Sequence, residues 1–328
     1  MTPILLEGQP VWNRLIRFED VNGQERYGEP VDDDLDVGIA LHRGEDVYAR
    51  IIRAESALDL SAALSEDVVQ VKRVSGETYN YRTWISFVDG ETDTGTAQTR
   101  GSGYYTMHWT QLPRTRQMKL SIPKTPTMFL KATETINDPS SHIVAPHCAD
   151  LHDCHLDYEV ELAVVIGKTC KDVSEDHAME YVLGYMTAND VTARTHQNEV
   201  SQWDRGKGFD GFAPIGPALV SSRVIPDPSV LKLQTVLNGQ VMQQGEASDM
   251  IFSIPKIVSF LSQGCTLQKG TIILTGTPCG IGVSRNPPVR LVEGDELFVT
   301  ISHGLGSLTN PIAFKESTHN GHLIEARA

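Results

Sequence analysis

A pair of glutamates separated by one residue, Glu159 and Glu161, constrains the fold of this chain more than any other feature. The apolar, β-branched run at residues 160–166 predicts a strand. Side chains alternate between the faces of a strand, so both carboxylates project from one side, roughly 6–7 Å apart. A hard divalent cation such as Mg²⁺ or Ca²⁺ would relieve their repulsion and lost hydration. An edge strand whose acidic face meets solvent is the alternative, and the pair alone does not exclude it.

A third carboxylate, Asp190, follows about thirty residues later in an Asn-Asp-x-Thr-x-Arg sequence that ends at Arg194. This sequence comes after an apolar segment and is typical of a strand end that turns into another element. From there Asp190 can point back towards the glutamate pair. Its alternative role is to cap a helix that begins near Val191, a common use of aspartate. We interpret Arg194 as an ion-pair partner of the acidic residues.

Two later segments rich in glycine and proline carry further polar residues. Lys207 opens the first, residues 207–217, and Thr277 lies in the second, residues 273–282. Such segments form shaped loops, and loops held by a rigid scaffold are where functional sites concentrate. The alternatives are a solvated loop lysine for Lys207 and a turn-forming residue for Thr277.

In this order, the segments resemble the catalytic domain of the fumarylacetoacetate hydrolase family over about residues 123 to 315. The matching segments are 126–131, 157–167, 184–194, 207–217, 238–239, 248–252 and 274–282. The resemblance implies a divalent metal, Mg²⁺ or else Mn²⁺ or Ca²⁺, held by Glu159, Glu161 and Asp190. It also implies substrate contacts from Gln197, Lys207 and Thr277, and assembly as a homodimer.

The same resemblance predicts an α+β, mostly β fold with a mixed β-roll catalytic domain. We expect a small N-terminal domain at residues 1–75, a divergent linker and lid region at 76–122, and the catalytic domain at 123–328. Apolar spacing predicts short helices at residues 58–64 and 254–261. In the second helix Pro255 stands near the start, where proline is tolerated.

The predicted lid departs most from the family pattern, which is Gly-x-Asn-Tyr-x-x-His-x-x-Glu. Here Tyr105 and His108 keep their spacing, but Gln111 stands where the family has glutamate. A divergent lid with altered chemistry, a gene-model error and a loop that merely covers the site all fit this pattern. We favour a real, divergent lid in which His108 is the candidate base, since its pKa is near neutrality. An ordinary loop histidine is the alternative.

Composition limits the partners. The formal charge of −14 over 328 residues argues against nucleic acid and anionic membranes, which need concentrated lysine and arginine. No apolar stretch approaches the length of a membrane span, and no secretory signal is expected.

The odd number of cysteines, without disulfide or zinc spacing, predicts a reduced, cytoplasmic setting; they are Cys148, Cys154, Cys170, Cys265 and Cys279. His155, close to Glu159, is a candidate to support the metal ligands.

The predicted site suits a small 2-oxo or 1,3-diketo acid as substrate, because a divalent cation can bind its two oxygens and polarise the carbonyl. The first hypothesis is an enzyme that hydrolyses a C–C bond in an acylpyruvate-like acid. The second is a metal-dependent decarboxylase or isomerase that acts on a 2-oxo acid and could belong to a biosynthetic pathway. These reactions depend less on His108 and Gln111 than hydrolysis does. The third is a catalytically impaired, metal-containing binding protein.

Overall fold

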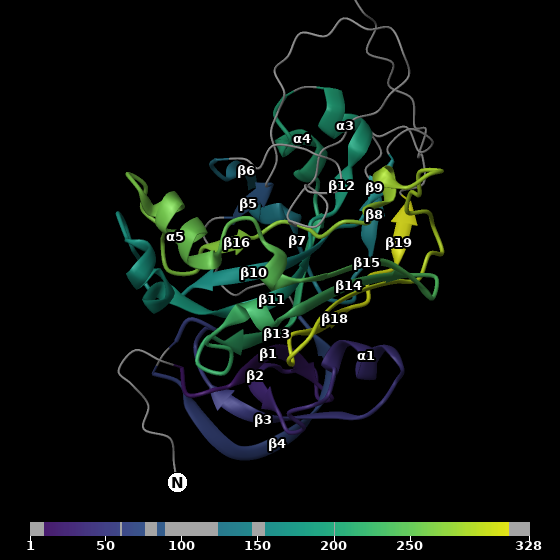
Figure 1. Ribbon diagram of the computed structural model, residues 1–328. Coiled ribbons are helices and arrows are strands. Elements are labelled where there is room, and N and C mark those ends of the chain that lie inside the picture. The colour runs from purple at the N-terminus through teal and green to yellow at the C-terminus, as the bar shows by residue number, and fades with distance from the viewer. Residues whose placement is uncertain are drawn as a thin grey trace, which may run out of the picture.

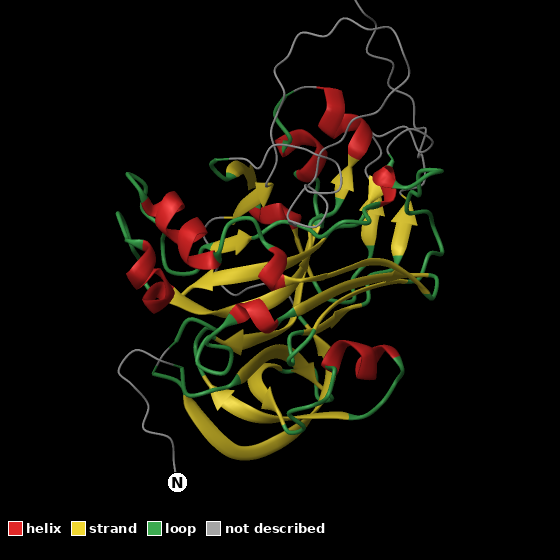
Figure 2. Ribbon diagram, in the orientation of Figure 1, coloured by secondary structure: helices red, strands yellow, loops and turns green. Residues whose placement is uncertain are grey.

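The computed structural model describes residues 10–59, 61–75, 84–88, 124–145, 155–199 and 201–314. Strands dominate these residues and the helices are short, as Figure 2 shows, so the predicted mostly-β α+β fold is confirmed. None of the helices in these residues is long and apolar enough to cross a membrane.

The N-terminal elements occupy one end of the molecule (Figure 1). They are β1 (Arg14–Asp20), β2 (Glu25–Pro30), α1 (Val37–His42), β3 (Val47–Arg53) and β4 (Ala63–Val74). The helix predicted at residues 58–64 is wrong, since β4 already begins at Ala63. The polar, β-branched sequence that continues through β4 pairs with β3 instead.

The remaining strands form the rest of the fold, and helices and short 3-10 turns lie between them. The strands are β5 (Trp84–Val88), β6 (Thr127–Lys131), β7 (Ile136–Asn137), β8 (Ile143–Ala145), β9 (Leu156–Asp157), β10 (Val160–Ile166), β11 (Val182–Asn189), β12 (Thr192–Ala193), β13 (Ala213–Ser221), β14 (Lys232–Leu237), β15 (Gln240–Glu246), β16 (Ile272–Leu274), β17 (Leu297–Ile301), β18 (Gly306–Leu308) and β19 (Ile312–Phe314). The helices are α3 (Arg194–Glu199), α4 (Asp204–Lys207) and α5 (Ile254–Ser262), with 3-10 turns η1 (Thr133–Thr135), η2 (Glu175–Tyr181), η3 (Pro228–Val230), η4 (Ala247–Asp249) and η5 (Gly282–Ser284).

One large sheet runs through the molecule in the order β2-β3-β4-β1-β13-β11-β10-β16-β5-β6. The N-terminal strands join it where β1 pairs antiparallel with β13, with Leu15 opposite Leu219. A second sheet, β15-β14-β17-β18, packs against its centre through apolar side chains of β14 and β17. The domain boundaries near residues 75 and 122 stay predictions.

Strand β10 lies at the centre and is buried on both faces. Val160, Leu162 and Val164 point into one apolar cluster, while Ala163 and Val165 point into another. The alternation predicted from the sequence is therefore present, but each face meets a core rather than one face meeting water. Glu161 shares the face of Ala163 and Val165, which excludes the solvent-facing alternative.

Helix α5 is confirmed where the sequence predicts it. The Ser253 side chain caps it by accepting from the Lys256 amide, and Pro255 lies in the first turn. The buried face of α5 carries Ile257 and Val258 into the same apolar cluster as Leu162.

A candidate metal centre at the ends of two strands

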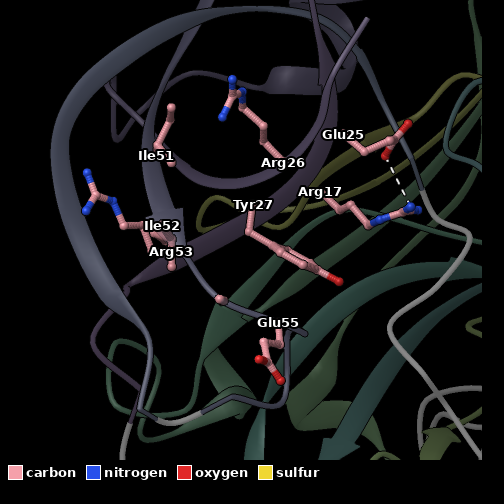
Figure 3. Close-up of a pocket in the computed structure, with 9 residues that line it drawn as sticks. Arg17, Glu25, Arg26, Tyr27, Ile51, Ile52, Arg53 and Glu55 are labelled. Atoms are coloured by element: carbon pink, nitrogen blue, oxygen red, sulfur yellow. Dashed lines mark ion pairs between the residues drawn. The ribbon is translucent and has the colours of Figure 1, made fainter.

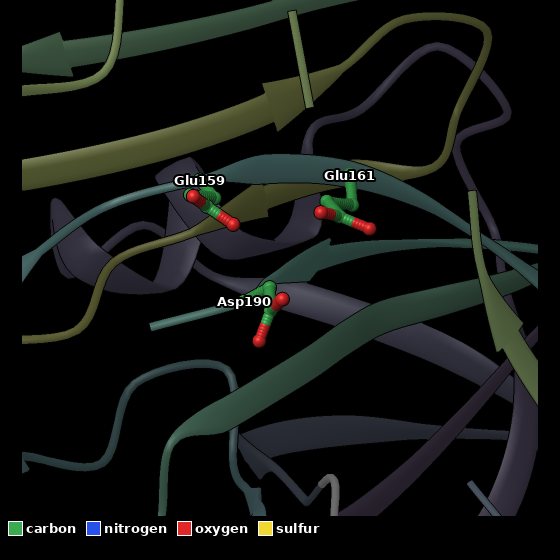
Figure 4. Close-up of side chains that lie close together, drawn as sticks. All are labelled: Glu159, Glu161 and Asp190. Carbon is green, nitrogen blue, oxygen red and sulfur yellow. The ribbon is translucent and has the colours of Figure 1, made fainter. Parts of the chain in front are cut away.

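The three predicted carboxylates meet because β10 and β11 are antiparallel neighbours. Val160 lies opposite Asn189. The residues next to this pair, Glu159 and Asp190, therefore lie beside each other where β10 begins and β11 ends. The Asp190 amide donates to the Glu159 carbonyl at 2.9 Å, which holds the two strand ends together. Figure 4 shows the three carboxylates converging, and one oxygen from each lies within 4.8 Å of the others.

All three carboxylates are fully buried, so the protein must supply compensating charge. Lys207 does so with its ammonium group, which donates to Glu159 Oε2 at 2.7 Å and to Asp190 Oδ2 at 2.6 Å. Its third partner is the Thr192 hydroxyl at 2.8 Å. Burial lowers the pKa of Lys207, but Asp190 and Glu159 outweigh burial and the net pKa is raised. Lys207 is thus a fixed buried cation, which excludes the solvated-lysine alternative.

Arg194 is the second cation at the site, as the sequence predicts. Its guanidinium donates to Glu159 Oε1 at 2.7 Å and to Asp157 Oδ2 at 2.9 Å. It also donates to Gln197 Oε1 at 3.1 Å. Gln197, which the resemblance predicts to contact the substrate, is thus buried on α3 beside the cluster. Asp190 bonds lysine side chains and does not cap α3, which begins at Arg194.

Asp157 is a supporting residue that the sequence analysis did not single out. Its carboxylate accepts from the backbone amides of Gly282 and Val283 at 2.7 and 3.0 Å, in addition to Arg194. It therefore ties the start of the glutamate pair to the loop that follows Thr277. The Asp-x-Glu-x-Glu spacing was the available signal, because residues two apart share a face of an extended chain.

Lys131 on β6 is a third buried cation that the sequence analysis missed. It donates to Asp190 Oδ1 at 2.6 Å, and to the carbonyls of Lys207 and Phe212 at 2.5 and 3.1 Å. The signal was the period of the strand, in which Phe129 and Lys131 point inward while Met128 and Leu130 are exposed. A lysine on the buried face of a strand needs a partner of opposite charge.

Glu161 provides the chemical test of whether a metal fits. Its Oε2 accepts from the Gly276 amide at 2.7 Å, whereas its buried Oε1 has no hydrogen-bond partner among the described residues. Burial, with Asp190 and Glu159 close by, raises the pKa of Glu161 well above its usual range. An uncommitted buried oxygen within a set of three carboxylates suits a hard divalent cation. The residues present therefore fit the metal that the sequence pattern predicts.

The Thr277 hydroxyl accepts from the Gln243 side-chain amide at 2.7 Å. Gln243 is itself fixed, since its oxygen accepts from the Val160 amide and the Thr235 hydroxyl. Because a hydroxyl both accepts and donates, this bond leaves the proton of Thr277 for another acceptor. Thr277 is therefore oriented by β10 and β15, beside the Gly276 amide that holds Glu161.

His155 precedes β9 with a positive φ of 43°, and its carbonyl accepts from the Arg194 amide. Burial is the main cause that lowers the pKa of His155, which favours a neutral ring. Through its backbone carbonyl, His155 supports Arg194, the cation that holds Glu159. Tyr105, His108 and Gln111 of the predicted lid, like Cys148 and Cys154, lie outside the described residues.

A cavity of about 440 Å³ lies apart from this cluster, in the N-terminal strands. Figure 3 shows Tyr27 among arginines of β1, β2 and β3, with Glu25 of β2 and with Glu55, which follows β3. Arg17 pairs with Glu25, and Arg26 with Asp20, so these cations are balanced by neighbouring carboxylates. None of the residues lining this cavity belongs to the acidic cluster.

Residues 100–313 match the family model described as fumarylacetoacetate hydrolase, C-terminal. A caffeoylpyruvate hydrolase from Neonothopanus nambi is 38% identical over 304 residues, which are 92% of this chain and 93% of that protein. The oxaloacetate tautomerase YisK of Bacillus subtilis is 44% identical over 191 residues, 58% of this chain and 62% of that protein. Among solved structures, a 2-hydroxyhepta-2,4-diene-1,7-dioate isomerase from Mycobacterium marinum has a TM-score of 0.69 at 30% identity, covering 92% of this chain and 99% of that one.

Proposed function

This chain is an enzyme of the fumarylacetoacetate hydrolase family, and we propose that it is a divalent-metal-dependent hydrolase of acylpyruvate-like 1,3-diketo acids. The observation that carries the proposal is the buried cluster of Glu159, Glu161 and Asp190, in which Glu161 Oε1 is uncommitted. The hydrolase from Neonothopanus nambi supports this reaction, because its similarity extends over nearly the whole chain. The similarity to the tautomerase YisK covers little more than half of it.

We assign the metal to Glu159, Glu161 and Asp190, with Mg²⁺ as the expected ion and Mn²⁺ or Ca²⁺ as alternatives. When bound, such an ion polarises the substrate oxygens and stabilises the negative charge of an enolate. The protein contributes the orientation of its ligands: Arg194 and Lys207 fix Glu159, Lys131 and Lys207 fix Asp190, and the Gly276 amide fixes Glu161. Oriented ligands lose little freedom when substrate arrives.

In the proposed reaction, water adds to the distal carbonyl of the diketo acid and the adjacent C–C bond then breaks. The bonding electrons leave as the enolate of the 2-oxo acid, which takes up a proton, while the acyl half departs as a carboxylic acid. Lys207 stabilises the developing enolate by exchanging its Thr192 hydroxyl partner for a substrate oxygen. The Thr277 hydroxyl and the side chain of Gln197 are assigned to the substrate. His108 is the proposed base that takes the proton from water.

The second candidate is a tautomerase, isomerase or decarboxylase of a 2-oxo acid. The similarity to the tautomerase YisK and to the isomerase from Mycobacterium marinum favours it. These reactions need the enolate to be stabilised but need no water to be activated. His108 would then be dispensable, whereas the three carboxylates and Lys207 would not.

One assay separates the candidates. Purified protein is stripped with EDTA, reloaded with Mg²⁺ or Mn²⁺, and given acylpyruvates or oxaloacetate with product analysis. We expect metal-dependent release of pyruvate and the matching carboxylic acid from acylpyruvates. Keto–enol exchange or CO₂ from oxaloacetate, without hydrolysis, would support the second candidate. Turnover that survives removal of the metal would contradict both, and inactivity with metal bound would support a binding protein.

We further propose that the protein acts in the cytoplasm as a homodimer. The family resemblance of the catalytic domain supports the homodimer. The odd number of cysteines, without disulfide spacing, supports the cytoplasmic setting. Light scattering at micromolar concentration should give twice the 36.1 kDa chain mass. A monomer mass under these conditions would contradict the dimer.

A further inference from the structure

Lys131 is the one described cation of the cluster that touches neither glutamate of the pair. Its ammonium group has three N–H donors, and all three are used by Asp190 and by two backbone carbonyls. A neutral amine has only two N–H groups, so it would leave one of these close acceptors without a donor. Burial lowers the pKa of Lys131, but Asp190 opposes this, and the three acceptors around the fully buried ammonium group match its protonated form.

The charges around the site can be counted from the described residues. Four buried carboxylates, those of Asp157, Glu159, Glu161 and Asp190, face three buried cations, Lys131, Arg194 and Lys207. The ionised cluster thus carries one excess negative charge, and a divalent cation brings it to one excess positive charge. Without Lys131 the loaded cluster would be neutral.

One excess positive charge on the metal-loaded cluster favours the binding of an anionic substrate. A 2-oxo or diketo acid brings one carboxylate, and its reaction develops a second negative charge on the enolate. Charges in a buried site are weakly screened, so the net charge of the site strongly affects how tightly the substrate binds. The same cation opposes entry of the metal, because like charges repel through a medium of low dielectric constant.

We propose that Lys131 sets the charge of the site, favouring the anionic substrate at the cost of weaker binding of the metal. This inference rests on the metal dependence proposed above. Lys131 acts through Asp190 and through the charge balance, so it is a charge-setting and positioning residue rather than a catalytic one. At an effective dielectric constant of about 20, one unit charge several ångströms away changes the affinity for an ion by roughly tenfold or more.

The test measures two affinities by titration calorimetry: Mn²⁺ for the metal-free protein, and oxalate, a stable dianion with two adjacent carboxylates, for the Mn²⁺-loaded protein. Lys131→Met should change both affinities by about tenfold or more, binding Mn²⁺ more tightly and oxalate more weakly. Lys131→Gln removes the same charge but keeps an amide donor, and should shift both affinities in the same directions. Lys131→Arg keeps the charge and should restore the binding of oxalate.

Lys256→Met is the matched control, because it breaks a lysine–carboxylate pair of similar length, 2.7 Å to Glu175, on the surface. It should change neither affinity. If Lys131→Met and Lys131→Gln weaken both affinities together, or change neither, the charge-setting role is wrong while the metal site stands. If the wild-type protein binds no Mn²⁺, the proposed metal dependence and this inference both fall.

Discussion

The acidic cluster and the N-terminal cavity both join arginine or lysine to carboxylates, yet they differ in what those pairs can do. In the cavity Arg17 lies 3.2 Å from Glu25, and 40% of the glutamate side chain is exposed. In the cluster the Lys207–Glu159 pair at 2.7 Å is fully buried. Water screens the first pair, whereas only protein groups balance the second.

The comparison shows why sequence alone cannot rank charged residues. In the N-terminal cavity, Arg17 and Glu25 lie where solvent can replace a lost partner. At the ends of β10 and β11, each carboxylate oxygen except Glu161 Oε1 has a named donor. The exception marks where an external cation fits.

The largest expected effect is on activity, when Glu161 loses its charge. Glu161→Gln keeps the shape of the side chain but replaces a carboxylate oxygen with an amide. Turnover should fall by more than about 10²-fold, since even the loss of a supporting residue around a metal costs about 10–100-fold. The metal-free protein should stay at least as stable as wild type, because burial already disfavours the charged form of Glu161. Steady-state kinetics and urea unfolding check both statements, and retained turnover would contradict the assigned role.

The next effect is on stability and sharpens the comparison directly. Arg194→Met leaves Asp157 and Glu159 buried without their guanidinium, and breaking such a buried pair costs about 3–5 kcal/mol. The matched variant Arg53→Met breaks a surface pair at 3.7 Å to Asp67 and should cost about 0–1 kcal/mol. Urea denaturation of both variants without added metal gives the two values. Equal losses would mean that the two regions do not differ as described.

A smaller effect is expected at Thr277. Thr277→Val removes the hydroxyl while Gln243 keeps its second acceptor, the Pro278 carbonyl. Loss of one hydrogen bond to substrate should lower kcat/KM by roughly tenfold. Thr277→Ser keeps the hydroxyl and should stay close to wild type. If the valine variant has unchanged kcat/KM, Thr277 shapes the turn and does not contact the substrate.

The smallest effect concerns pH and the N-terminal strands. The side-chain bond from Arg26, followed by the backbone amides of Gln24 and Asn22, lowers the pKa of Asp20 in the folded chain. Its contribution to stability is therefore present above the unfolded pKa, about 3.9, and is lost as pH falls through the lower folded value. Asp20→Asn should be less stable than wild type at pH 7, and the gap should narrow on acidification. Urea unfolding over that pH range would contradict this if the gap stayed constant.

The sequence predicted that Glu159, Glu161 and Asp190 meet, because strand periodicity fixes which side chains share a face. Glu159 and Glu161 follow from that rule alone, and their meeting with Asp190 follows from antiparallel pairing of β10 with β11. Lys131 and Asp157 were missed because their roles depend on contacts with segments far away in the chain. Lys131 meets Asp190 from 59 residues away, a distance that no local pattern encodes. The helix expected at residues 58–64 failed for the same reason, since pairing with β3 decides that segment.

The central claim is that Glu159, Glu161 and Asp190 hold one divalent cation on which turnover depends. The most direct measurement is Mn²⁺ binding to the EDTA-stripped wild-type protein and to Glu161→Gln, followed by titration of activity with the same Mn²⁺. We predict one Mn²⁺ per wild-type chain, activity that rises in proportion to occupancy, and loss of both in the variant. Equal Mn²⁺ binding by both proteins, or turnover by the stripped wild-type protein, would contradict the account.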